Sequence, residues 1–476
     1  GSVEAIRRVV LRYQDLHAEL RGPPASDVLR GALVAWADQI GGGDLAARRA
    51  SLRVLDLAAE ASVSDANTAA RADHERAQLA AALAAERPVE ALRLYAAVGD
   101  RSAAIEPMAA ILATFEAGSS LWVEAGDATA LWLTAAQDHP AAGDIRARRD
   151  EARERERDPA RVAMVASDDV DALAAAFAAH PHDHGVAVVL ARARRDGGKL
   201  DDAIATLTGL GAPGRMTAEA QAALGSLYAE ADKLDDGERV LAGLITAELA
   251  AYQDAVSRYD RAARAAETAL VERAERGQLP ADVDSEARQA SPQKQQEILS
   301  AWLRRELEQD SRLASLAEDV GRRSHVVPAA LSLGMVRLRQ ASAAAGETRD
   351  QLLARAEAAF LSVRSQAEGR PEFHLGLGQV YYRLGKTEDG ERELARVLAG
   401  EDPRLRLAAG EVYRDLGLDR RATEIAEAVW SDSSDVPIRS DAAILRALLA
   451  RDVDDRETWL ARADQIGVAR VPGRQR

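Results

Sequence analysis

The chain of 476 residues contains no cysteine. It can therefore form no disulfide bond, no thiolate metal site and no cysteine nucleophile. Aromatic residues are also scarce, at 4% of the chain, although 47% of the residues are hydrophobic. Alanine supplies much of this hydrophobic fraction, and alanine has the highest helix propensity of all residues. The composition therefore favours an all-helical protein.

The sequence also lacks long hydrophobic runs and an excess of positive charge. No stretch approaches the roughly 18 consecutive apolar residues of a membrane span, and no signal peptide opens the chain. We therefore expect a cytoplasmic protein, or a periplasmic one if a signal sequence has been removed. The formal net charge is −15, which argues against a general nucleic-acid binder because cations supply most of the affinity for phosphates. An RNA-reading helical repeat protein is kept as an alternative.

What the sequence does contain is a repeat. Residues 224–244 (LGSLYAEADKLDDGERVLAGL) return as residues 377–397 (LGQVYYRLGKTEDGERELARV), with the same glycine, tyrosine, lysine and Asp-Gly-Glu-Arg at the same offsets. A further copy places Gly410 at a distance of 32 residues from Gly378. A period of this length is typical of solenoids, in which neighbouring units share one continuous core.

This pattern resembles the tetratricopeptide repeat (TPR) family, whose helix-turn-helix unit of about 34 residues contains L-G-x2-Y and then A-x3-F. The resemblance is strong for residues 185–245 and 328–430 and weak elsewhere. It implies an all-α, right-handed superhelical solenoid of antiparallel helix pairs.

One segment does not fit a TPR unit. Residues 244–276 contain neither glycine nor proline, so a single helix could extend for about 50 Å. Its apolar residues, from Ile245 to Leu270, alternate at spacings of four and three, as in a coiled-coil seam. Residues 293–320 carry an apolar face that could cover this seam. We therefore predict a projecting antiparallel helical hairpin, which serves as a bridge between two arrays or as a docking arm or dimer contact.

These patterns divide the chain into six segments. They are degenerate N-terminal helical repeats at 1–158, TPR-like repeats at 159–244, the hairpin insertion at 245–326, TPR repeats at 327–435, C-terminal capping helices at 436–470, and a loose tail at 471–476.

The sequence shows no catalytic motif. It has no His-Glu-x-x-His helix, no P-loop lysine and no Gly-x-Ser-x-Gly elbow. His180, His182 and His184 form the one conspicuous cluster, since imidazoles are metal ligands. No second cluster completes a site, so we favour a polar turn between helices, while the sequence alone leaves metal binding open. We expect no catalytic residue, no cofactor and no metal, and hence no enzyme.

The resemblance implies that function lies in a concave groove lined by the first helix of each unit. Some family members hold a chaperone's C-terminal carboxylate there with a lysine-asparagine clamp, but Leu375 and Gln379 occupy those places in this chain. Counting each small residue as the eighth of its unit gives the implied groove residues. They are Arg192, Arg195, Glu219, Ser226, Glu372, Leu375, Gln379, Tyr382, Arg383, Leu407, Glu411 and Arg414.

The resemblance thus implies a non-catalytic scaffold that binds a peptide or helix of a protein partner in the groove, with the hairpin as a second contact. Two alternatives stay open. The chain could be the regulatory or sensor region of a larger multidomain protein, or a self-assembling structural protein that forms a homodimer through its long helices. No motif identifies the partner.

Overall fold

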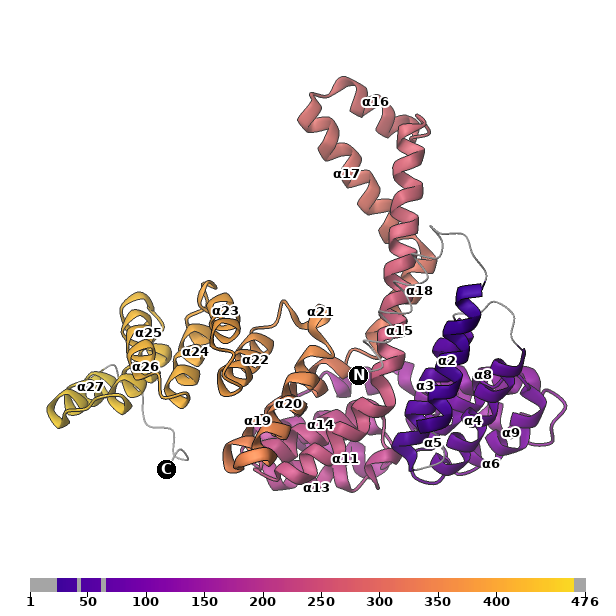
Figure 1. The fold of residues 1–476 in the computed structure, drawn as a ribbon, viewed down its shortest axis with the longest axis horizontal. Coiled ribbons are helices and arrows are strands. Elements are labelled where there is room, and N and C mark those ends of the chain that lie inside the picture. The colour runs from indigo at the N-terminus through magenta and orange to yellow at the C-terminus, as the bar shows by residue number, and fades with distance from the viewer. Residues whose placement is uncertain (1–23, 41–43, 61–65, 466–476) are drawn as a thin grey trace. The chain divides into compact units, whose positions relative to one another are not determined.

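The structure is a computed structural model, which describes residues 24–40, 44–60 and 66–465. All regular elements within these residues are helices, and no strand occurs among them. The predicted all-α solenoid class is confirmed, because consecutive helices pack as antiparallel pairs joined by short turns (Figure 1). The chain forms two compact units, which divide between Leu224 and Gly225, and each unit is described by itself.

Unit 1 is built from short helices. They are α2 (Pro24–Ile40), α3 (Leu45–Glu60), α4 (Ala66–Leu83), α5 (Pro88–Ala96), α6 (Arg101–Leu112), α7 (Leu121–Glu124), α8 (Gly126–Ala135), α9 (Ala142–Arg157), α10 (Pro159–Val165), α11 (Val170–Ala179), α12 (His184–Asp196), α13 (Leu200–Thr208), the 3-10 turn η1 (Pro213–Arg215) and the beginning of α14 (Ala218–Glu230).

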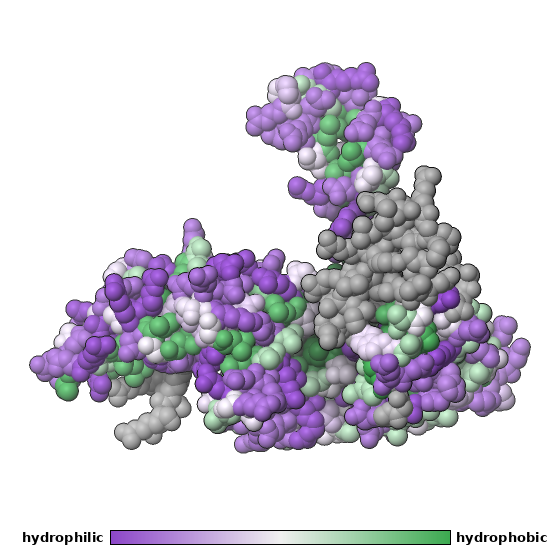
Figure 2. All heavy atoms as spheres, in the orientation of Figure 1, coloured by the Kyte–Doolittle hydropathy of each residue, from purple (hydrophilic) through white to green (hydrophobic). Residues whose placement is uncertain are grey.

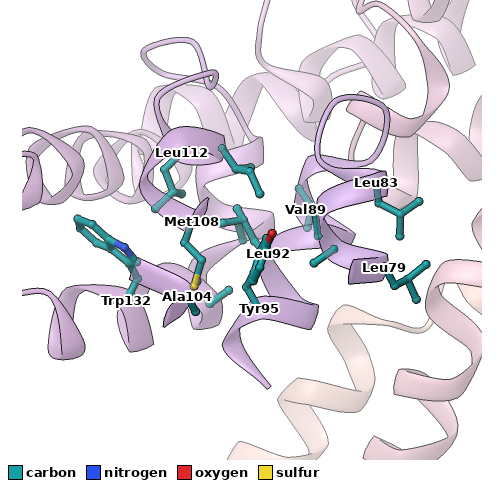
Figure 3. Packing of buried hydrophobic residues seen from close by; sticks show 14 of the residues in the cluster. Leu79, Leu83, Val89, Leu92, Tyr95, Ala104, Met108, Leu112 and Trp132 are labelled. Carbon is teal, nitrogen blue, oxygen red and sulfur yellow. The ribbon is translucent and has the colours of Figure 1, made fainter. Parts of the chain in front are cut away.

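The core of unit 1 is filled by aliphatic side chains and a few large aromatic ones (Figure 3). Trp132 of α8 is 2% exposed, and its indole N–H donates to the carbonyl oxygen of Ile105 at 2.8 Å. Trp122 is completely buried and meets the ring of Phe115 edge-on, with 5.4 Å between the ring centroids. Because each buried indole N–H has an acceptor, these bulky residues fill the core without leaving an unpaired donor.

Unit 2 contains the end of α14 and thirteen further helices. They are α15 (Leu234–Glu275), α16 (Ala281–Gln289), α17 (Pro292–Gln309), α18 (Ser311–Arg322), α19 (Val326–Ala343), α20 (Gly346–Leu361), α21 (Arg364–Ala367), α22 (Pro371–Arg383), α23 (Thr387–Leu398), α24 (Pro403–Asp415), α25 (Asp419–Asp432), α26 (Val436–Leu448) and α27 (Val453–Gln465).

A small residue brings the two helices of each pair close together in unit 2. A Cβ atom built on Gly225 of α14 would lie 2.5 Å from Leu241 of α15, and one on Gly378 of α22 would lie 2.9 Å from Leu394 of α23. These distances are shorter than any normal Cβ contact, so glycine is required for the observed approach. Ala443 of α26 is the equivalent small residue in the last pair. It packs in one cluster with Trp459 of α27, and these two residues are as far apart in the sequence as Gly378 and Leu394.

The predicted hairpin is present. Helix α15 has 42 residues and extends beyond its repeat, and the chain returns through α16, α17 and α18 (Figure 1). Figure 2 shows apolar residues between the arms near the tip and hydrophilic residues on the outside. Arg258 on the outgoing arm pairs with Asp319 on the returning arm at 2.8 Å, and Trp302 is 2% exposed. The returning arm therefore covers part of the seam, whose first residues Ile245, Leu249 and Val256 pack against the repeat core.

The hairpin differs from the prediction in two respects. The returning stretch 293–320 is broken at Asp310, whose carboxylate accepts from the N–H groups of Arg312 and Leu313 and so begins a new helix. In addition, Tyr252 of α15 is 4% exposed and belongs to the core formed with α19 and α20. The first turns of the predicted insertion are thus part of the repeat core. The loose tail predicted at 471–476 lies outside the described residues.

Candidate functional site

The first helices of four successive pairs in unit 2 present side chains at equivalent positions. These helices are α19, α22, α24 and α26, and each contains one small residue that packs toward its second helix: Gly334, Gly378, Gly410 and Ala443. Residues one and five places later lie on an adjoining side of each helix, because positions four apart share a face. We call these eight residues the A face. They are Met335, Arg339, Gln379, Arg383, Glu411, Asp415, Ile444 and Leu448.

Direct contacts show that neighbouring first helices bring these residues together. The guanidinium of Arg383 on α22 donates to the hydroxyl of Ser342 on α19. Arg383 also interacts electrostatically with Asp415 on α24 and with Arg349 on α20. The A face is therefore continuous from α19 to α24 at this end of the helices.

Apolar side chains remain exposed on the A face. Met335 is 39% exposed, Ile444 is 40% exposed and Leu448 is 62% exposed. Exposed hydrophobic residues that stand alone are ordinary, but Ile444 and Leu448 lie one helical turn apart on α26. On the side of the molecule seen in Figure 2, apolar residues lie in patches between charged ones over the helices α22 to α26. Such a surface can contact both apolar and charged groups of a partner.

The charges on the A face follow an order. Partial burial and the nearby positive charge of Arg349 lower the pKa of Arg383, and the carboxylate of Asp415 opposes this effect. Arg349 is exposed and makes no ion pair within the described part of the chain. Glu411 on the next first helix is likewise exposed and has no partner among the described residues. Unpaired positive charge around α22 is thus followed by unpaired negative charge on α24.

Several residues implied by the TPR resemblance lie on α22 and α24 but differ in exposure. Glu372 and Glu411 are exposed, whereas Gln379 and Leu407 are only 8% and 7% exposed. Leu375 is half-buried against the core. Arg414 is half-buried and pairs with Asp415 at 2.8 Å. Ser226 on α14 is also half-buried and lies 3.3 Å from the hydroxyl of Ser332.

Tyr382 has a structural environment of its own. Its hydroxyl donates to the carboxylate of Glu391 on α23, and the hydroxyl of Tyr413 on α24 donates to the same oxygen at 3.0 Å. Arg421 on α25 approaches the other oxygen at 3.3 Å. Burial and the Glu391 carboxylate raise the pKa of Tyr382 to about 12 and raise that of Tyr413 as well. Tyr382 therefore joins two repeats and offers little free surface.

The remaining implied residues lie in unit 1. Arg192 on α12 pairs with Glu219 on α14 at 2.9 Å, and about half of each side chain stays exposed. Arg195 pairs with the adjacent Asp196 at 2.7 Å. Exposed pairs of this kind contribute little to stability, so the side chains can exchange these contacts for others.

The histidine cluster divides between surface and core. His180 and His182 are exposed, whereas His184 is 3% exposed. Burial lowers the pKa of His184 to about 4, against the opposing charge of Asp183. The neutral ring accepts a hydrogen bond at Nδ1 from the N–H of Thr217, at 3.0 Å. Among the described residues, no three His, Asp or Glu side chains are placed to hold a metal ion.

Asp183, which precedes His184, is itself buried, at 2% exposed. Its carboxylate accepts from the N–H of Val186, which caps α12, and from Nε of Arg161 at 2.7 Å. Burial opposes ionisation of Asp183, but the hydrogen bonds and positive charge of Arg161, helped by Arg155, hold its pKa below the ordinary value. This buried cluster is a structural element that joins α9, α10 and α12.

A hollow of about 430 Å³ opens beside His374 at the ends of α21 to α24. His374 Nδ1 lies 2.6 Å from a carboxylate oxygen of Glu393, and Nε2 lies 2.7 Å from the carbonyl oxygen of Glu368. Both ring nitrogens are thus occupied, so His374 offers neither a free base nor a free ligand.

The sequence interpretation missed four exposed residues: Met335, Arg349, Ile444 and Leu448. Counting the register from Gly334 leads to Met335. Ile444 and Leu448 were missed because the sequence analysis predicts capping helices at 436–470 rather than a further pair. No pattern in the sequence points to Arg349, which reaches Arg383 from a second helix.

Comparisons with known proteins give no family for this chain. No protein-family model matches it, and no curated protein sequence matches it. Solved structures with a similar arrangement include the human IFIT1 dimer with m7Gppp-AAAA, at 10% identity and a TM-score of 0.36, covering 91% of this chain and 93% of that one. Another is the assembly chaperone of RpL4 (Acl4), at 17% identity and a TM-score of 0.22, covering 56% and 96% of the two chains.

A third similar structure is Naa15/Naa10 bound to HypK-THB, at 14% identity and a TM-score of 0.20, covering 94% of this chain and 69% of that one. At TM-scores below 0.5, no conclusion about the partner of this chain follows from any of the three. None of the helices that the structure describes combines the length and apolar character needed to cross a membrane.

Proposed function

We propose that this protein is a non-catalytic scaffold and that the A face of unit 2 binds a segment of another protein. The observation that carries the proposal is the exposure of Met335, Glu411, Ile444 and Leu448 at equivalent positions of the first helices α19, α24 and α26. A repeat array supports an extended binding surface because each unit adds an equivalent helix to it. The long hairpin is a candidate second contact.

Two observations favour a binding role over catalysis. The buried titratable groups His184, Asp183 and His374 all use their polar atoms in hydrogen bonds within the protein. A catalytic acid or base must instead be able to reach a substrate proton. Within the described part of the chain, the exposed Glu411, Ile444 and Leu448 of the A face have no such internal role.

Self-assembly through the hairpin is the weaker alternative. An exposed seam would have favoured it, but Ile245, Leu249 and Val256 pack against the repeat core. Leu270 is half-buried, and Trp302 and Leu313 are almost completely covered within the chain. The hairpin therefore has no large apolar surface that requires a second copy to cover it.

The proposal can be tested by affinity capture from a lysate of the source organism, with and without ribonuclease, followed by mass spectrometry. The test variant combines Glu411→Arg with Leu448→Glu on the A face. The matched control is Arg420→Glu, because the Arg420 side chain is 92% exposed on the second helix α25.

We expect a protein that binds the wild type and the control but not the A-face variant, with no effect of ribonuclease. Capture that survives Glu411→Arg with Leu448→Glu would contradict the proposal. Capture that is abolished by ribonuclease would instead favour an RNA-mediated function.

A further inference from the structure

The A face carries its unpaired charges and its apolar residues in a fixed order along the array. Arg383 provides positive charge at α22, next to Arg349 on the second helix α20, which lies outside the A face. Glu411 provides negative charge at α24, and Ile444 and Leu448 provide apolar surface at α26. A ligand that lies across the first helices meets these groups in that sequence. Such an order is complementary to one arrangement of ligand side chains and unfavourable to the reverse arrangement.

A charged side chain can bind a ligand only with hydrogen-bond donors or acceptors that the protein itself does not already use. Arg339 already donates to the carbonyl oxygen of Ala229 and pairs with Asp232, and Asp415 is held by Arg414. Among the described residues, Arg383 donates to the hydroxyl of Ser342, and its charge also faces the carboxylate of Asp415. Because a guanidinium has five N–H donors, Arg383 keeps donors for an incoming carboxylate. Arg349 and Arg383 repel each other because both are positively charged. A ligand carboxylate placed near both would reduce this repulsion and would therefore be stabilised by both residues.

The spacing of the helices sets the spacing of the ligand residues. Packed helices stand about 8–10 Å apart, and an extended chain advances about 3.3 Å per residue. An extended ligand that crosses the array thus places about every third residue over a new first helix. A helical ligand rises only about 1.5 Å per residue. It would therefore need six or seven residues to pass from one first helix to the next, and the side chains between them would point away from the A face.

We propose that the A face binds an extended protein segment with an acidic residue over Arg383 and Arg349, a basic residue over Glu411 and an aliphatic residue over Ile444 and Leu448. The three side chains stand at every third position, so the segment spans seven residues, in either chain direction. This inference rests on the proposed function and adds the chemistry of the partner to it. The charge order makes binding selective, whereas the aliphatic contact at α26 supplies an anchor.

The experiment is selection of binders from a random dodecapeptide library displayed on phage, with the full chain as target. Three targets are compared: the wild type, the variant Leu448→Glu, and the charge-exchanged variant Arg383→Glu with Glu411→Arg. Circular dichroism of each target confirms that it is folded. A fourth target, Arg349→Glu, alters an exposed residue and keeps the test decisive if the charge-exchanged variant does not fold.

We expect the wild type to select peptides with an acidic, a basic and an aliphatic residue three positions apart. The charge-exchanged variant should select an acidic residue over position 411 and lose the preference for an acidic residue over position 383, where Arg349 keeps its positive charge. A synthetic wild-type peptide should bind at least tenfold more weakly when its acid and base are exchanged, and several-fold more weakly to Arg349→Glu.

Two different results would overturn the inference, and they differ in whether the proposed function is also wrong. Peptides that require Leu448 but show no charge order would refute the inference and leave the proposed function intact. If no peptide is enriched, or if all enriched peptides bind Leu448→Glu equally well, both the inference and the proposed function would be wrong.

Discussion

The two units fill the space between their helices in opposite ways. In unit 1, large side chains such as Trp122, Trp132 and Phe115 occupy the core, each with an exposed fraction of 2% or less. In unit 2, glycines let the helices approach, and a Cβ atom on Gly334 or Gly376 would lie 2.6 or 2.3 Å from the ring of Phe360. Close approach requires one particular small residue at one position, whereas a core of large side chains can be filled in many ways.

This difference predicts opposite sensitivities. The buried aromatic residues of unit 1 should be sensitive to the removal of bulk, and the close-contact glycines of unit 2 to its addition. The following four substitutions test the contrast, and hydrogen exchange measured by mass spectrometry reports on each unit separately, because local opening is resolved along the chain.

The largest effect is expected for Trp132→Ala in unit 1. The substitution removes a buried ring and its hydrogen bond to Ile105, and large-to-small changes of this kind cost about 3–5 kcal/mol. Amides of α6 and α8 should lose protection from exchange while those of α22 to α25 keep it. Equal loss of protection in both units would show that the two cores are not separate, contrary to our comparison.

The next effect concerns pH and the buried His184 of unit 1. The pKa of His184 is about 4 in the folded chain, whereas a histidine in the unfolded chain has the ordinary pKa of 6.5. Between pH 4 and pH 6.5, the unfolded chain therefore binds a proton that the folded chain does not bind. The stabilisation from burying the neutral ring is therefore present above pH 6.5 and is lost as the pH falls to 4. The loss amounts to about 3 kcal/mol.

His184→Asn is the matched control, because its amide oxygen can accept from Thr217 and does not titrate. Urea unfolding at pH 7 and pH 4 should show a greater loss of stability in the wild type than in the variant. The difference isolates His184 from Asp183 and Glu156, which also titrate in this cluster. An identical pH dependence in both proteins would refute the role of the neutral ring.

A smaller effect is expected when bulk is added to unit 2 by Gly376→Val. The new side chain would overlap the buried ring of Phe360, and overpacking typically costs about 1–3 kcal/mol. Gly143→Val in α9 is the control, since no atom lies within 4 Å of a Cβ there. Thermal unfolding should show a lower midpoint for the first variant alone. A similar decrease for both would mean that helix propensity, not close approach, explains the glycines.

The smallest effect is expected for Tyr413→Phe in unit 2. The change removes one of the two hydroxyl groups that donate to the Glu391 carboxylate. A hydrogen bond to a charged group contributes about 1.5–3 kcal/mol, and because Tyr382 and Arg421 still contact this carboxylate we expect a loss near the lower end of that range. Denaturant unfolding should detect this loss, together with faster exchange where α22 meets α24. An unchanged stability would show that the shared carboxylate does not join the repeats.

The same contrast explains which parts of the fold could be predicted from the sequence. The repeats of unit 2 were recognisable because Gly225, Gly378 and Gly410 stand at the same place in their copies of the motif. Gly225 and Gly378 are required by close contacts, whereas a Cβ atom on Gly410 would lie 3.2 Å from Ile425 and Leu445. The long helix α15 was recognisable because it lacks glycine and proline. The break at Asp310 was missed, since a capping aspartate looks like any other charged residue until its N–H partners are known.

The candidate site was predictable only in part. Counting positions from Gly378 and Gly410 leads to α22 and α24 but could not show that Gln379 and Leu407 are buried or that Tyr382 is bound to Glu391. Exposure depends on the neighbouring repeat, which a count along one helix does not contain. The buried pair of Asp183 and His184 was missed for the same reason, because Arg161 comes from a different helix.

The most direct test of a partner on the A face is site-specific photo-crosslinking in cells of the source organism. A photoreactive amino acid replaces Ile444 on the A face or, as the control, Arg420 on the second helix α25. Our account predicts one discrete cross-linked protein from position 444 and none of it from position 420. Cross-linking of the same protein from position 420 alone, or no protein cross-linked from position 444, would contradict the claim that the A face is the binding surface.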